Sequence, residues 1–221
     1  LERIGTGDFG EVWRVRDLID HELYAIKKSL QPFRSVKEQG LFIDEMRNVE
    51  SLGVHPCVLR HFRAWQEEGH FFVQTELCAK GSLANILDVP ETSAAALAQL
   101  GLADERGAWR LLASLVSALA CLHSHDLIHM DVKPSNVYIS GDGSLRLGDF
   151  GHTIHVQSWE DGAEGDSIYM APEVLSNSGV VGTPSVIFSA GLTVYDMCSL
   201  ELPEGQGARW LVFRTEHSVE C

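Results

Sequence analysis

Two short polar motifs, separated by an apolar stretch, constrain this chain more than any other feature. The first is Ile128–Asn136 (IHMDVKPSN) and the second is Gly148–Gly151 (GDFG). An isolated Asp-x-Lys or Asp-Phe-Gly usually marks a solvated turn, but here both occur in order around the apolar hairpin expected at 137–147. Together they predict one site that combines a carboxylate base with oxygen ligands for a metal ion.

Phosphoryl transfer is the chemistry that needs this set of side chains, because its loose transition state is stabilised mainly by positioning and charge. Asp131 can orient and deprotonate the attacking hydroxyl, and Lys133 can neutralise the moving phosphoryl group. Asn136 and Asp149 supply the oxygen ligands that hard cations such as Mg²⁺ select. The two motifs therefore predict Mg²⁺-dependent transfer from a nucleoside triphosphate.

A glycine-rich stretch near the start of the chain supplies a candidate nucleotide site. Residues 4–12 (IGTGDFGEV) match G-x-G-x-x-G-x-V, in which glycines let backbone amides approach phosphates closely. The pattern alone fits a dinucleotide-binding turn or the ATP-covering loop of a kinase. A strand follows it here, and the next strand ends in Tyr24-Ala25-Ile26-Lys27, which selects the second arrangement. Lys27 is then expected to hold the α and β phosphates.

The segments that follow predict a helix, two strands and a hinge between two lobes. A helix is expected from Val36 to Leu52, with Glu45 as the favoured ion-pair partner of Lys27 and Glu38 and Glu50 as alternatives. Strands are expected at 58–65 and 70–76, and the hinge, against which adenine should lie, at 77–83. The expected nucleotide-binding residues are Ile4, Gly5, Gly7, Gly10, Val12, Lys27, Thr75, Glu76 and Cys78.

The remainder of the chain predicts a mainly helical second lobe. Apolar residues recur at helical spacing from Glu105 to Ser124, and another buried helix is expected from Val186 to Leu200. A short helix is also expected within 88–104. The expected fold is α+β and bilobal, with an antiparallel N-lobe at 1–77, an incomplete C-lobe at 78–205 and an atypical tail at 206–221.

Composition excludes several other classes of protein. A net charge of −14 argues against a nucleic-acid partner, which would need a basic surface. The five cysteines are widely spaced and form no C-x-x-C pair, so we expect a reducing compartment, the nucleus or the cytoplasm. The longest apolar run, at 186–200, is too short and too often interrupted to span a membrane. Because the sequence opens on strand-like residues without a targeting segment, we expect a fragment or an excised domain.

With these motifs placed, residues 1 to about 205 resemble a eukaryotic protein kinase, and finer cues resemble the Wee1/Myt1 inhibitory kinases. The cues include Ala64-Trp65 before an acidic turn, Gly81-Ser82-Leu83, His129-Met130-Asp131 and Glu164-Gly165-Asp166-Ser167. The resemblance implies the cofactors ATP and Mg²⁺. It also implies a protein substrate, a cyclin-dependent kinase with its cyclin, phosphorylated on an inhibitory tyrosine that restrains entry into mitosis.

Three positions depart from what is usual in kinases. Met130 replaces an arginine that needs a phosphate partner, so the activation segment at 152–170 is expected to be ordered without phosphorylation. Val186 replaces an aspartate that anchors the catalytic loop, at a cost of roughly 1.5–3 kcal/mol. Glu173, in Ala171-Pro172-Glu173, is expected to lack its usual arginine partner.

Two alternatives remain open. Lys133 is typical of serine/threonine kinases and favours a kinase of another family, such as those that act on translation initiation factor 2. Val186 and the incomplete C-lobe favour an inactive remnant that binds a kinase or a cyclin. Retention of Lys27, Asp131, Asn136 and Asp149 argues against such a remnant.

Overall fold

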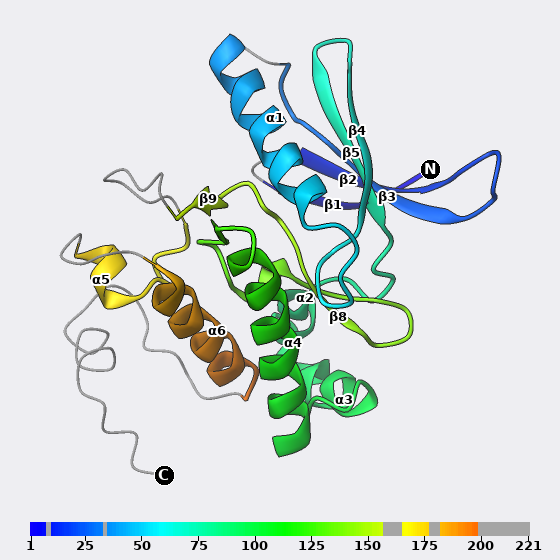
Figure 1. Ribbon diagram of the computed structural model, residues 1–221. Coiled ribbons are helices and arrows are strands. Elements are labelled where there is room, and N and C mark those ends of the chain that lie inside the picture. Colours follow the sequence, from blue (N-terminus) through cyan, green and yellow to red (C-terminus); the bar gives the residue numbers. More distant parts are fainter. Residues whose placement is uncertain (8–9, 33–34, 157–164, 177–181, 199–221) are drawn as a thin grey trace.

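The computed structural model describes residues 1–7, 10–32, 35–156, 165–176 and 182–198. The tail expected at 206–221 and the acidic residues at 157–164 lie outside these ranges. Within them, an antiparallel five-stranded sheet and one helix form an N-lobe, and the other helices gather on the opposite side of the hinge (Figure 1). The predicted α+β, two-lobed architecture is confirmed.

The sheet has the strand order β1-β2-β3-β5-β4. Side chains alternate between its two faces, so Lys27 faces the interlobe cleft while Lys28 lies over the Phe72 ring on the other face. The expected strand at 58–65 begins later, at His61, because the Leu59 amide donates its hydrogen bond to the Leu147 carbonyl oxygen of the C-lobe instead. The strands are β1 (Glu2–Gly7), β2 (Gly10–Arg16), β3 (Leu23–Lys28), β4 (His61–Glu67) and β5 (His70–Glu76).

Helix α1 (Val36–Ser51) follows β3 and lies along the sheet (Figure 1). Its Phe42 ring stacks on Phe71 of β5 with 3.6 Å between ring centroids. The helix ends before Gly53, which adopts a φ of 64° that glycine takes without strain. The expected helix at 36–52 is therefore present, and it is attached to the sheet through an aromatic contact.

The C-lobe is built around two long helices that lie side by side (Figure 1). One of them, α4, is capped by Asp104, the residue before its first turn, whose side chain accepts a hydrogen bond from the Gly107 amide. The other, α6, begins earlier than expected because Pro184 is accommodated in its first turn. The helices are α2 (Leu83–Leu87), α3 (Pro90–Gln99), α4 (Glu105–His123), α5 (Pro172–Leu175) and α6 (Thr183–Met197).

Two short hairpin-like pairs lie between α4 and α5 and carry the functional loops. Strand β6 (Leu127–Ile128) pairs with β9 (Ile154–His155), and β7 (Val137–Ile139) pairs with β8 (Leu145–Leu147). A single 3₁₀ turn, η1 (Pro134–Asn136), connects the first motif to β7. Both polar motifs therefore lie in connections whose ends are fixed by strand pairing.

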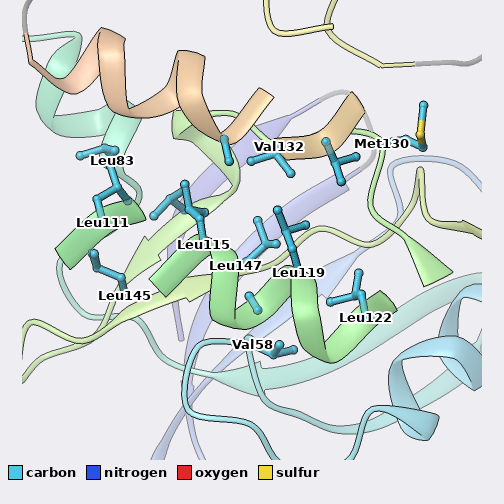
Figure 2. Close-up of a cluster of buried hydrophobic side chains, with 14 of the residues drawn as sticks. Val58, Leu83, Leu111, Leu115, Leu119, Leu122, Met130, Val132, Leu145 and Leu147 are labelled. Atoms are coloured by element: carbon cyan, nitrogen blue, oxygen red, sulfur yellow. The ribbon is translucent and has the colours of Figure 1, made fainter. Parts of the chain in front are cut away.

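A continuous apolar core lies directly beneath these loops (Figure 2). The inward face of α4 contributes Leu111, Leu115, Leu119 and Leu122, each no more than 1% exposed. Burying a leucine side chain stabilises a fold by roughly 1.5–3 kcal/mol, so this face alone fixes α4 firmly. Val132, between two functional residues, is itself 1% exposed and anchors the loop in the core. Across the described ranges, no helix combines the length and the apolar character that crossing a membrane requires.

Candidate active site

A cleft of about 430 Å³ lies between the two lobes. Eight of the nine residues expected to bind nucleotide line it, and the ninth, Gly7, ends β1 and pairs with Gly10. A Cβ at Gly10 would lie 2.3 Å from the Lys28 carbonyl oxygen, so only glycine allows this close approach of two strands. The cleft also receives Asp131, Lys133, Asn136 and Asp149, which brings both sequence motifs to one place.

Asp131 and Asn136 form a buried hydrogen-bonded unit in the catalytic loop. The Asn136 amide nitrogen donates to the Asp131 carboxylate oxygen Oδ2 at 2.8 Å and to the Asp131 backbone oxygen at 2.7 Å. Asp131 is 6% exposed and Asn136 is 4% exposed, so water competes little for these hydrogen bonds. The carboxylate is thus held in one orientation before any substrate arrives.

His129 supports this unit from below. Its Nδ1 accepts a hydrogen bond from the Asp131 amide at 3.3 Å, which leaves Nε2 to donate to the Gly148 carbonyl oxygen at 3.1 Å. Complete burial lowers the pKa of His129 to about 4, so the imidazole is neutral at physiological pH. The ring also packs edge-on against Phe150. One neutral histidine therefore joins the backbones of the two motifs.

Lys133 lies beside the catalytic carboxylate. Its ammonium is 3.1 Å from Asp131 Oδ2 and 3.6 Å from Asp166 Oδ2. The sequence motif predicts the first neighbour, whereas the contact with Asp166 was missed, because Gly165-Asp166 by itself indicates only a turn.

Asp149 and Lys27 face each other across the cleft. The Lys27 ammonium donates to Asp149 Oδ1 at 3.2 Å. Burial opposes ionisation of Asp149, but the Lys27 charge and hydrogen bond outweigh it and hold the pKa of the carboxyl below its usual value. Asp149 adopts a φ of 61°, which is uncommon for a side chain larger than glycine and is held by its packed neighbours.

Glu45 of α1 enters the same region, and the charge of Lys27 acts on it electrostatically. Burial raises the pKa of Glu45 to about 7, and the Asp149 charge adds to this rise. The alternative Glu50 is exposed, and the Glu38 side chain lies outside the description. Glu45 as the partner of Lys27 stays a prediction.

Residues 75–78, at the end of β5 and the start of the hinge, line the cleft. Glu76 Oε1 accepts hydrogen bonds from the Arg60 amide at 2.8 Å and from Arg146 Nε at 3.2 Å. Thr75 is 9% exposed and lines the back of the cleft. Burial raises the pKa of the Cys78 thiol to about 11, so it acts as a packed, unreactive side chain.

A comparison with families of known proteins identifies the family of this chain. The model of the protein kinase domain matches residues 1–214. The chain belongs to the protein kinase family. Its kinase motifs are those that the geometry brings into the cleft, but the role of each residue here stays a prediction.

Individual relatives point to one branch of the kinases. The membrane-associated tyrosine- and threonine-specific cdc2-inhibitory kinase of Caenorhabditis elegans is 38% identical over 95% of this chain and 29% of its own length. The mitosis inhibitor protein kinase wee1 of Schizosaccharomyces pombe is 33% identical over 96% of this chain and 24% of its own length. A probable protein kinase of Dictyostelium discoideum is 37% identical over 95% of this chain and 58% of its own length. The resemblance to the Wee1/Myt1 kinases is confirmed, and the chain spans between 24% and 58% of the length of these relatives.

The unusual positions of this kinase are accommodated by packing. Val186 is 2% exposed and Met130 is 6% exposed, and both belong to the same apolar core. Two side chains that replace charged residues are therefore buried without an uncompensated charge. Glu173, expected to lack its usual arginine partner, accepts a hydrogen bond of 2.7 Å from the Ser185 hydroxyl. A serine of α6 thus holds the end of the activation segment.

Proposed function

We propose that this protein kinase uses ATP and Mg²⁺ to phosphorylate a tyrosine of a cyclin-dependent kinase. The observation that carries the phosphotransfer proposal is the convergence of Asp131, Lys133 and Asn136 with Lys27 and Asp149 in one cleft. The set contains a base, two cations and two oxygen donors, which is what transfer of a phosphoryl group requires.

The donor set fits a magnesium nucleotide. Both side-chain hydrogen bonds of Asn136 within the described part of the chain use its amide nitrogen, which leaves the amide oxygen available to a hard cation. The pKa of Asp149 is held low, so this carboxylate is ionised and able to bind the same cation. Bound Mg²⁺ would supply positive charge beside the phosphates.

Each remaining residue has one task in this reaction. Asp131 takes the proton of the substrate hydroxyl. The hydroxyl oxygen can then bond to the phosphoryl group as the nucleoside diphosphate leaves. Lys133 stabilises the charge on the phosphoryl group in transit, and Lys27 holds the phosphates that remain. The neutral His129 keeps the Asp131 backbone in place and takes no proton.

Two observations point to different phosphorylated residues, tyrosine in one case and serine or threonine in the other. The names of the relatives describe tyrosine- and threonine-specific kinases that inhibit cdc2. Lys133 beside the base is typical of serine/threonine kinases and favours a short acceptor side chain. We give more weight to the relatives, because the similarity covers 95% of the chain or more rather than one residue. Threonine is the second acceptor in this proposal.

Phosphosite mapping tests the proposal. The kinase is incubated with Mg-ATP and a catalytically inactive cyclin-dependent kinase bound to its cyclin, and products are mapped by mass spectrometry. Phosphate on a tyrosine of the glycine-rich loop of that target supports the proposal. Phosphate confined to serines, or found only on translation initiation factor 2, contradicts it.

We propose a reducing compartment, the nucleus or the cytoplasm, as the place of action. The support is chemical: the four cysteines in the described ranges are all free thiols. Imaging of the tagged protein in cells tests this proposal, and a secreted or lumenal protein would contradict it.

A further inference from the structure

We infer that two copies of this chain associate through their N-lobes, each placing its β2–β3 turn against the outer face of the other copy's sheet. The β2–β3 turn comprises residues 17–22, and the outer face is the side of the sheet opposite α1. Neither the turn nor the aromatic rings of the outer face line the cleft. The inference therefore goes beyond the proposed phosphotransfer and does not depend on it.

The β2–β3 turn is held rigidly and ends in two exposed aliphatic side chains. The Asp17 carboxylate accepts a hydrogen bond from the Ile19 amide at 2.7 Å, and the Asp20 carboxylate accepts one from the Glu22 amide at 2.8 Å. The Asp17 amide closes the turn by donating to the Glu22 carbonyl oxygen at 3.0 Å. At the tip, Leu18 is 88% exposed and Ile19 is 92% exposed. Such a turn loses little conformational freedom on binding, which favours association through this tip.

The outer face of the sheet carries a row of aromatic rings. Trp65 of β4 pairs with Phe72 of β5, and their rings stack with 5.2 Å between centroids. A bulge in β4 turns Phe62 outward, where it is 42% exposed and packs edge-on against Tyr24 at 5.1 Å. In the ranges that the structure describes, no helix lies over this side of the sheet (Figure 1). Aromatic residues on an open face are typical of the cores of protein interfaces.

Three cations lie over these rings, at 4.7 to 5.7 Å from the ring centroids. The pairs are Lys28 over Phe72, Arg60 over Phe62, and Arg63 over Trp65. Arg63 also lies 3.7 Å from the Asp17 carboxylate of its own turn. Among the described residues, by contrast, no ion pair engages Lys28 or the Arg60 guanidinium. These two cations can therefore meet carboxylates from a second molecule.

The turn matches this face in charge as well as in apolar character. Asp20 and Glu22 follow the aliphatic tip directly. Hydrogen bonds from the Glu22 amide and the Tyr24 hydroxyl hold the pKa of Asp20 below its usual value, so this carboxylate is ionised. An aliphatic tip bordered by carboxylates thus fits a row of rings bordered by Arg60 and Lys28.

A second copy of this chain is the occupant that the arrangement favours. The turn projects beyond the sheet (Figure 1), and the exposure of its tip shows that it does not pack on its own outer face. In a pair related by a two-fold axis, each copy offers both surfaces, so every contact forms twice. Because the chain carries a net charge of −14, two copies repel each other unless cations of one meet carboxylates of the other.

Sedimentation velocity over a concentration series tests the inference. We expect the wild type to form dimers, and the double substitution Leu18→Ser with Ile19→Ser to weaken them roughly tenfold or more, because the apolar tip is lost. Val54→Ser is the matched control, since it replaces an aliphatic side chain that is 75% exposed outside both surfaces. A wild type that stays monomeric up to about 100 µM overturns the inference and points to a different protein as the partner of this face. A dimer that survives the double substitution also overturns it.

An exchange of charges tests which surfaces meet. Arg60→Glu on the face and Glu22→Lys on the turn should each weaken self-association, because each places like charges together at both symmetric contacts. Mixed in equal amounts, the two variants should associate as the wild type does, because one contact is then native and the other has its charges exchanged. Melting temperatures equal to that of the wild type show that the variants are folded. Failure of the mixture to associate overturns the inference. A wild type that dimerises but transfers no phosphate contradicts only the proposed function.

Discussion

The two halves of the cleft differ in how completely their functional groups are held. On the C-lobe side, Asp131 is fixed by Asn136, Lys133, His129 and the Asp166 amide, and it is 6% exposed. On the N-lobe side, Lys27 reaches across the cleft to Asp149, and Glu45 lies nearby as a carboxyl with a pKa raised to about 7. The proposed base is thus held within its own lobe, whereas Lys27, which we propose binds the phosphates, forms an ion pair with a residue of the other lobe.

This difference indicates which step each half serves. Groups that act on the transition state gain most from fixed positions, because no reorganisation is then needed during reaction. Groups that receive the nucleotide must exchange partners, and Lys27 has to share its ammonium between Asp149 and incoming phosphates. We therefore expect the C-lobe half to be formed in advance and the N-lobe half to complete itself when nucleotide binds.

The largest expected effect comes from the pre-formed half. Asp131→Asn keeps the side-chain shape but removes the base, so phosphorylation of the protein substrate should fall about 10³-fold, because general base catalysis contributes on this scale. Binding of Mg-ATP, measured by calorimetry, should change little. Asp142→Asn serves as the control. Wild-type turnover by Asp131→Asn would remove the assignment of the base.

The next effect concerns the lysine of the N-lobe half. Lys27→Met should lower kcat/KM for ATP about 10²-fold, because a cation that holds the phosphates is lost. The matched control is Lys28→Met, one residue further along β3, where the ammonium lies over the Phe72 ring on the other face. Steady-state kinetics with ATP as the varied substrate gives the comparison. Equal losses in both variants would show that β3 tolerates neither change and that the assignment to Lys27 is wrong.

The pH dependence of stability sharpens the account of Glu45. Its pKa rises from 4.5 in the unfolded chain to about 7 in the fold, so the protonated form is favoured by folding. Its contribution to stability is fully present below pH 4.5 and is lost as the pH rises through 7, for a total of roughly 3 kcal/mol. Between pH 5 and 8, the free energy of unfolding of Glu45→Gln, from urea titrations without nucleotide, should therefore rise relative to that of the wild type by most of this amount. Glu50→Gln, on the exposed side of α1, should show no such gain.

The smallest effect lies outside the cleft, at the end of the activation segment. Ser185→Ala removes the hydrogen bond to the Glu173 carboxylate, and we expect a loss of about 1 kcal/mol in the free energy of unfolding. The comparison is Ser176→Ala, which removes a hydrogen bond from the exposed Ser176 hydroxyl to the Pro172 carbonyl oxygen at the end of α5. A loss in Ser185→Ala no larger than in an exposed serine variant would show that Glu173 needs no partner.

The parts of the fold predicted from sequence are those fixed by local pattern. The helix at 105–123 follows from leucines spaced along one face, and the hairpin of β7 and β8 follows from two apolar runs around a glycine turn. The start of β4 was predicted too early, because Leu59 is as apolar as a strand residue but bonds to Leu147, far along the chain. Pairing between distant segments leaves no local signal.

The site follows the same division. The motif residues Asp131, Asn136 and Asp149 meet in the cleft as expected, because their spacing along one loop and hairpin decides their placement. The ion pair of Lys27 with Asp149, the contact of Asp166 with the base, and the bond from Ser185 to Glu173 join segments that no periodicity relates. Such contacts depend on how the two lobes and the activation segment dock, which the sequence pattern does not encode locally.

Hydrogen–deuterium exchange with and without Mg-ATP tests the central contrast most directly. The amides of Asp131, Asn136 and Asp166 each have a protein acceptor, so they should be protected in the free protein and change little when nucleotide binds. The amides of α1 and of the glycine-rich hairpin of β1 and β2 should gain protection. Rapid exchange of the catalytic-loop amides in the free protein, with protection appearing only on addition of Mg-ATP, would contradict the account.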